Sequence, residues 1–353
     1  MGTRGRTALF YLILTLTPVL GTLVAGEVLL RLMAPQELSG TWLTYGPRGL
    51  VVNKSAATAR HQQGDTVVRY RFNRLHQRGV EPQPGAQRVL ILGDSFTFGW
   101  MLDETESYVG RLQVRVDERF GPGRFHLQNA ATAGWGAADY LAYLEAFGEQ
   151  AAPVLVVVFV NFDDLDRALR KPLYVLGPDG RAVAQDLSGE RSRLKMIMDR
   201  VPAYDWLLEN SHAVQLIRNA AVRESRTVVS DAMPAPAVGY AQPVSPAPEV
   251  DSRTPLAKAL VTRLKDWCEA RNIRLLALTT GWIEAAGRPW MSQFSEVLGP
   301  AFVDLAHGVA LVTRSEPAAY QFQSDGHPNA RGAGLIAAAA WPALEKALSE
   351  GTR

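Results

Sequence analysis

The feature that most constrains the fold is the apolar run VLVVVFV at positions 154–160. Valine and phenylalanine favour strands, and a run in which apolar and polar residues do not alternate is typical of a strand buried on both faces. A second short apolar run, Val89–Leu92, ends in turn residues and has the same character. Strands that are buried on both faces occur in parallel sheets connected by helices. We therefore expect an α/β fold.

Helical and extended segments alternate along the rest of the chain. Apolar residues recur at helical spacing in 108–120, and Gly121 follows as a stop signal. This alternation predicts a parallel sheet that is covered by helices on both faces. The other expected elements are a strand from His126, helices at 137–147, 256–271 and 330–348, and strands at 273–279 and 301–305.

The N-terminal segment predicts contact with a membrane. Residues 7–26 form a run of twenty residues without a charge, preceded by Arg4 and Arg6. A helix of this length spans about 30 Å, the thickness of the hydrocarbon layer. The basic flank is expected to stay in the cytoplasm, which places the rest of the chain on the other side, in the periplasm or at the cell surface.

Three interpretations of this segment compete. It is an uncleaved signal anchor over residues 1–34, a signal peptide cleaved near Val24-Ala25-Gly26, or a buried core helix. The apolar stretch is longer than the usual apolar region of a signal peptide and continues as EVLLRLM, which favours the anchor.

Composition excludes several classes of protein and partner. Of the 353 residues, 47% are hydrophobic and 20% charged, which excludes a wholly disordered, collagenous or coiled-coil chain. The net charge of +2 argues against nucleic acid as the main partner. The one cysteine, Cys268, excludes an internal disulfide and is expected to be buried on a helix. No phosphate-loop, dinucleotide, HExxH or EF-hand motif is found.

The expected domain organisation has three parts. Residues 1–34 form the anchor, and residues 35–87 form an extended arm that includes an alternating run at 65–72. Residues 88–350 form the α/β domain. Residues 170–255 interrupt it as an insertion with no clear strand, and six prolines among the 23 residues of 233–255 predict a flexible stretch.

Ser95 is the candidate nucleophile. It follows the strand 89–92 in the triplet Gly93-Asp94-Ser95, and open α/β proteins place ligands beyond the carboxyl ends of their strands. A serine needs a base to become a nucleophile. His327 is the best candidate for that base, because Asp325 lies in the same turn and can orient an imidazole.

Acyl transfer also requires hydrogen-bond donors for the oxyanion that develops on the carbonyl. The candidates are the backbone N–H groups of Ser95 and Gly134 and a side-chain amide after the strand 154–160. Each of these features is weak alone, since turn serines and turn glycines are common. Their order along the strands is more informative than any one of them.

That order resembles the SGNH hydrolases, also called the GDSL-type esterase/lipase family. The resemblance implies a three-layer α/β/α sandwich with about five parallel strands and no cofactor. It implies that Ser95 is the nucleophile, His327 the base and Asp325 the orienting acid, with an oxyanion hole made by Ser95, Gly134 and an asparagine. The matching blocks are GDSFTFGW (93–100), NAATAGWG (129–136), VVVFVNFDDL (156–165) and DGHPNARG (325–332).

The sequence departs from the family pattern at two positions. The commonest acid–base spacing, D-x-x-H, would place Ser324 at the acid position; the D-x-H spacing given by Asp325 is similar to that of membrane-associated polysaccharide acetyltransferases. In the third block, G-x-N-D places Asp163 where the family has its asparagine. An ionised carboxylate there would repel an oxyanion. Either Asn161 supplies the amide or Asp163 has another role.

Five other residues lie near these motifs. Trp100 and Trp135 are expected to pack beside the site or to line an acyl or sugar pocket. Arg167, Arg170 and Lys171 are expected to form a solvated basic edge, or to meet an anionic substrate.

The expected function is that of a membrane-anchored serine esterase or O-acyltransferase. It would act through a Ser95 acyl-enzyme on acyl groups, expected to be acetyl, of an envelope or exported polysaccharide. A transferase would need an acyl donor at the membrane, such as an envelope protein partner. The alternatives are an inactive binding or assembly subunit of an envelope complex, which Asp163 and the stretch 233–255 favour, and a soluble intracellular lipase.

Overall fold

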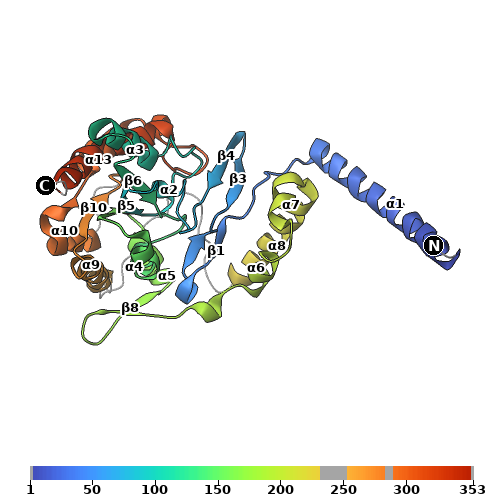
Figure 1. The fold of residues 1–353 in the computed structure, drawn as a ribbon, viewed down its shortest axis with the longest axis horizontal. Helices are drawn as coiled ribbons and strands as arrows, with labels where there is room; N and C mark the ends of the chain where they lie inside the picture. Colours follow the sequence, from blue (N-terminus) through green and yellow to red (C-terminus); the bar gives the residue numbers. More distant parts are fainter. Residues whose placement is uncertain (1–2, 231–252, 283–288, 351–353) are drawn as a thin grey trace. The chain divides into compact units, whose positions relative to one another are not determined.

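The computed structural model describes residues 3–230, 253–282 and 289–350 (Figure 1). Most of the predicted flexible stretch 233–255 lies outside the described residues; its last three positions belong to helix α9 (Arg253–Glu269).

A five-stranded sheet forms the centre of the fold, with the strand order β11-β10-β7-β5-β6. All neighbouring strands are parallel, so their carboxyl ends meet at one edge. The predicted α/β fold with a parallel sheet is confirmed. The strands are β5 (Gln87–Leu92), β6 (Phe125–Asn129), β7 (Leu155–Val160), β10 (Arg274–Thr279) and β11 (Phe302–Val303).

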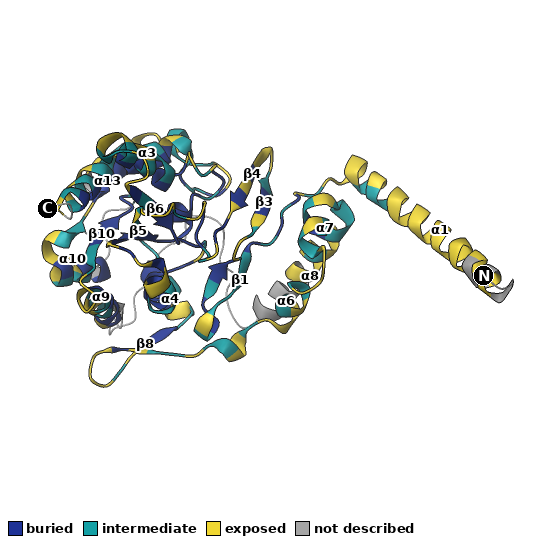
Figure 2. Ribbon diagram, in the orientation of Figure 1, coloured by how far each residue is buried: buried dark blue, intermediate teal, exposed yellow. Residues whose placement is uncertain are grey.

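Helices cover both faces of this sheet and produce three layers. Alternate residues of each strand point to opposite faces, so that Val156 and Val158 of β7 join one hydrophobic cluster and Val157 and Phe159 the other. Helices α4 (Ala137–Ala151) and α9 pack in the first cluster, and α3 (Tyr108–Phe120) and α13 (Ala330–Glu350) in the second. Figure 2 shows the buried sheet between these helices. Cys268 is buried on α9, as predicted.

Several shorter strands and helices are described besides the central sheet and its covering helices. One expectation is wrong: the segment 170–255 contains a hairpin of β8 (Tyr174–Leu176) and β9 (Ala182–Ala184). Strands of three residues are too short to show periodicity in the sequence. The other short strands are β1 (Leu43–Tyr45), β2 (Val51–Asn53), β3 (Thr58–Gln63) and β4 (Thr66–Arg71); the other helices include α2 (Ser95–Phe98), α5 (Asp164–Arg170), α6 (Arg193–Met198), α10 (Ser292–Leu298), α11 (Ala306–Ser315) and α12 (Pro317–Tyr320).

The chain divides into two compact units. The larger one contains the sheet and consists of Trp42–Thr58, Val68–Met196 and Val238–Arg353. The smaller one consists of Met1–Thr41, Ala59–Val67 and Ile197–Ala237, and it includes the helices α1 (Thr3–Met33), α7 (Tyr204–Asn210) and α8 (His212–Ser230).

Helix α1 is the one helix among the described residues that is long and apolar enough to cross a membrane, over Phe10–Met33. None of its most apolar window is buried inside the protein, which excludes the interpretation as a core helix. Pro18 lies inside this helix, as membrane-spanning helices tolerate.

Candidate active site

Ser95 lies at a tight junction between strand β5 and helix α2. Asp94 caps α2, and its Oδ1 accepts the Phe96 N–H at 2.9 Å. Gly93 is required in this turn, since a Cβ there would lie 1.9 Å from Thr97 Oγ1. The sequence thus folds into a strand–turn–helix junction that holds the serine at the carboxyl edge of the sheet.

The structure brings Ser95, His327 and Asp325 together from opposite ends of the chain. His327 Nε2 lies 2.8 Å from Ser95 Oγ, and Asp325 Oδ1 lies 3.2 Å from His327 Nδ1. The same oxygen of Asp325 accepts the backbone N–H of His327 at 3.1 Å, which fixes the turn. Burial raises the pKa of Asp325, but the contacts with His327 lower it more, so that the pKa lies below its usual value. This arrangement can activate a serine hydroxyl.

Trp100 contacts both members of the Asp325–His327 pair. Its Nε1 donates a hydrogen bond to Asp325 Oδ2 at 2.9 Å, and its ring stacks on the His327 ring at 5.5 Å between centroids. The sequence had left pocket lining and packing open for this residue. Trp135, by contrast, is buried and donates to the carbonyl of Val51, which is a packing role.

Gly134 lies in the loop between β6 and α4. Its φ of 83° belongs to the left-handed region that favours glycine. It is exposed, and a Cβ there would meet nothing within 4 Å, so a ligand can approach its backbone.

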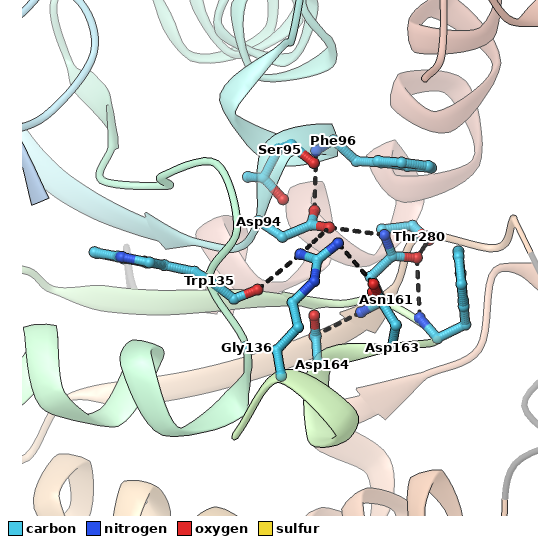
Figure 3. A network of polar contacts seen from close by, with 12 residues as sticks. Asp94, Ser95, Phe96, Trp135, Gly136, Asn161, Asp163, Asp164 and Thr280 are labelled. Atoms are coloured by element: carbon cyan, nitrogen blue, oxygen red, sulfur yellow. Dashed lines mark hydrogen bonds and ion pairs between the residues drawn. The ribbon is translucent and has the colours of Figure 1, made fainter. Parts of the chain in front are cut away.

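Asn161 and Asp163, the two candidates for the third oxyanion donor, have different partners. Asn161 is buried, and its Nδ2 donates to Asp94 Oδ2 at 2.8 Å, directly before Ser95 in the chain (Figure 3). Its Oδ1 accepts hydrogen bonds from the Phe162 N–H and the Thr280 hydroxyl. An amide nitrogen has two hydrogens, and the bond to Asp94 uses one.

The role of Arg167 was not predicted from the sequence. Its side chain is only 14% exposed, which corrects the expectation that it belongs to a solvated basic edge. It pairs with Asp94 Oδ2 at 3.0 Å and with Asp163 Oδ2 at 2.7 Å. Its neighbour Arg170 is exposed, whereas Lys171 is partly buried, 3.5 Å from Asp139.

Asp94, Asp163 and Asp164 form a carboxylate cluster in which each offers an oxygen within 4.8 Å of the others. Arg167 already supplies positive charge to two of them, so the cluster has the chemistry of an ion-pair network rather than that of a metal centre. Asp164 is fully buried, and burial raises its pKa well above its usual value, with a further increase from Asp94 and Asp163.

A comparison with protein families identifies one match. The model of the GDSL-like Lipase/Acylhydrolase family matches residues 91–335. No curated protein matches the chain.

Similar solved structures include the psychrotrophic esterase EstA from Pseudoalteromonas sp. (15% identity, 74% of this chain and 99% of that chain, TM-score 0.40). They also include the acetyl xylan esterase AlAXEase (12% identity, 73% and 99%, TM-score 0.39). A third is the two-domain esterase CEX, which is active on acetylated mannans (12% identity, 74% of this chain and 49% of that chain, TM-score 0.41).

The match to the family model extends from strand β5 into helix α13, covers more than two thirds of the chain and includes Ser95, Asp325 and His327. The chain therefore belongs to the GDSL-like lipase/acylhydrolase family and is a hydrolase that acts on ester bonds.

Proposed function

We propose that the chain hydrolyses esters through an acyl-enzyme on Ser95. Ser95 Oγ attacks the carbonyl carbon while His327 Nε2 takes its proton, and His327 then donates that proton to the leaving alcohol. Water attacks the acyl-enzyme in the second half of the reaction and regenerates the free serine. Asp325 keeps the His327 ring oriented and stabilises it when it is protonated.

The observation that carries this proposal is the 2.8 Å separation of Ser95 Oγ and His327 Nε2. Nucleophile and base lie at hydrogen-bond distance from each other. A protein that used these residues only for binding would need no such alignment, so the distance favours the enzyme over the inactive binding or assembly subunit.

The oxyanion hole in this proposal consists of the backbone N–H groups of Ser95 and Gly134 and the amide of Asn161. The exposed backbone of Gly134 supports its role. Asn161 is favoured over Asp163 because an amide donates hydrogen bonds whereas a carboxylate accepts them. Its bond to Asp94 places the amide beside the Ser95 turn.

We further propose that the substrate is an acetylated envelope or exported polysaccharide. The apolar helix α1 supports an uncleaved anchor at a membrane. Arg4 and Arg6 before the apolar segment support an extracytoplasmic catalytic domain.

A second candidate function is O-acyl transfer, in which a sugar hydroxyl replaces water as the acceptor. The D-x-H spacing of Asp325 and His327 favours it, since membrane-associated polysaccharide acetyltransferases have a similar spacing. An acyl donor at the membrane, such as a partner protein of the envelope, would then be required.

Labelling with a fluorophosphonate probe tests the proposal on the full chain in detergent micelles. We expect wild type to be labelled, Ser95→Ala and His327→Ala to remain unlabelled, and the remote control Ser349→Ala to behave as wild type. Release of acetate from acetylated polysaccharide, with and without a sugar acceptor, then separates hydrolysis from transfer. A folded wild type that neither reacts with the probe nor cleaves acetyl esters would contradict the proposal.

A further inference from the structure

The three loops of the proposed oxyanion hole share one side chain as a common contact. Arg167 bonds to Asp94, which directly precedes Ser95, and to the carbonyl of Trp135, which directly follows Gly134. It also pairs with Asp163 in the loop that follows β7. We propose that Arg167 is a positioning residue that holds the oxyanion donors in register and neutralises Asp163. This inference rests on the proposed function.

The distances show that one guanidinium serves all three loops. Arg167 Nη1 lies 3.0 Å from Asp94 Oδ2 and 2.8 Å from the Trp135 carbonyl oxygen, while Nη2 lies 2.7 Å from Asp163 Oδ2. A planar guanidinium presents several donors in a fixed geometry, so these contacts constrain one another. A lysine has a single charged nitrogen and cannot reproduce the arrangement.

Backbone packing brings the Gly134 loop against the helix that carries Arg167. A Cβ on Gly136 would lie 2.2 Å from the carbonyl oxygen of Asp164 and 2.9 Å from Arg167 Cβ. Only glycine permits this approach between the loop and the start of α5. A change at Arg167 is therefore transmitted to the Gly134 loop through direct contact.

Charge is the second reason for an arginine at this position. The family places a neutral asparagine where this chain has Asp163, and a lone carboxylate there would oppose a developing oxyanion. Arg167 pairs with that carboxylate and is itself shielded from solvent. Burial disfavours the guanidinium, but Asp94 and Asp163 raise its pKa, so Arg167 remains charged at every working pH.

The pair of Asp163 and Arg167 thus replaces one neutral residue by two opposite charges. Removing only the arginine leaves the carboxylates of Asp94 and Asp163 both without its charge, whereas the double change leaves only Asp94 without it. The double change should therefore lower activity less than the loss of Arg167 alone, and a role confined to packing does not predict this difference.

Steady-state ester hydrolysis and the rate of fluorophosphonate labelling test the inference on the full chain. We expect Arg167→Met to lower kcat and the labelling rate about 100-fold, with KM changed less than threefold, because the loss of one oxyanion donor has an effect of this size. Arg167→Lys keeps the charge but loses the two separate donor nitrogens of the guanidinium, and we expect kcat to decrease about tenfold. Arg170→Met, an exposed arginine on the same helix, is the matched control and should equal wild type.

The double variant Asp163→Asn/Arg167→Met carries the decisive comparison. We expect kcat of this double variant to be at least tenfold higher than kcat of Arg167→Met. Full activity in Arg167→Lys or in folded Arg167→Met overturns the inference, as does a double variant no faster than Arg167→Met. An inert wild type would instead show that the proposed function fails.

Discussion

At the scale of single residues, the turn before helix α13 brings the carboxylate of Asp325 against His327. Asp325 contacts His327 through Oδ1 and Trp100 through Oδ2, so both of its oxygens are used. Ser324, which the D-x-x-H spacing would select, is exposed. The geometry supports Asp325 as the orienting residue in the proposed mechanism.

Replacing Asp325 by asparagine should lower kcat about 1000-fold or more, with little change in KM, because an amide favours the wrong tautomer of the imidazole. The pKa of Asp325 lies below its usual value, so its carboxylate remains ionised above about pH 4. Ionisation of Asp325 should therefore add no pH dependence to the wild-type kcat from about pH 5 to 8. Ester hydrolysis over this range measures it, with Ser324→Ala as the control. A large loss in Ser324→Ala would contradict the assignment.

The sequence could predict the proximity of those site residues that directly follow strands of the sheet. Ser95 and Gly134 each follow a strand of one parallel sheet, so their proximity follows from the topology. The contacts of Trp100 and Arg167 depend on side-chain directions across the fold. Trp100 meets a carboxylate 225 positions away, and no pattern in the sequence carries that information.

At the scale of elements, the length of a helix or strand decided whether the sequence could predict it. Strand β7 and helices α3 and α13 have strong patterns, and their observed bounds differ from the prediction by at most two residues. The hairpin of β8 and β9 was missed because its strands hold three residues each. Its stability comes from pairing and from burial of Tyr174 and Ala182, which a local pattern does not reveal.

The end of helix α1 shows a tertiary contact that composition alone did not suggest. Glu27 accepts hydrogen bonds from the backbone N–H groups of His212 and Ala213 at 2.9 and 3.0 Å and from the hydroxyl of Ser211 at 2.9 Å. The first N–H groups of a helix have no partner within it, and a carboxylate stabilises them. Helix α8 is therefore capped by α1 within the smaller unit.

We expect Glu27→Gln to weaken this cap by about 1–2 kcal/mol, because one neutral oxygen replaces two charged ones. Hydrogen exchange of the full chain in micelles should show the amides of His212 and Ala213 exchanging about tenfold faster, as an energy of this size implies. Glu350→Gln, at the exposed end of α13, is the control. Unchanged exchange at both amides in Glu27→Gln would show that the contact does not stabilise α8.

At the scale of the whole molecule, the buried carboxyl groups determine how stability depends on pH. Burial raises the pKa of Asp139 above its usual value and the pKa of Asp164 well above it. The folded chain therefore retains protons that the unfolded chain has lost. For each proton that the folded chain retains and the unfolded chain has lost, the free energy of unfolding decreases by about 1.4 kcal/mol as the pH rises by one unit. The stability that such a group contributes is fully present below about pH 4 and is lost as the pH rises through its pKa in the folded chain.

Asp164→Asn should remove the largest part of this dependence. An asparagine oxygen can still accept the Asn161 N–H that Asp164 Oδ2 accepts at 2.7 Å, and an amide does not ionise. We expect the free energy of unfolding of the variant to decrease less steeply than that of wild type as the pH rises from about 4, by up to about 1.4 kcal/mol per pH unit while the folded wild type keeps the proton on Asp164. Urea unfolding followed by tryptophan fluorescence measures both slopes, and Asp166→Asn on the same helix is the matched control. Equal slopes in wild type and Asp164→Asn would mean that Asp164 is already ionised in the folded protein, and that Arg167 compensates all three carboxylates of the network.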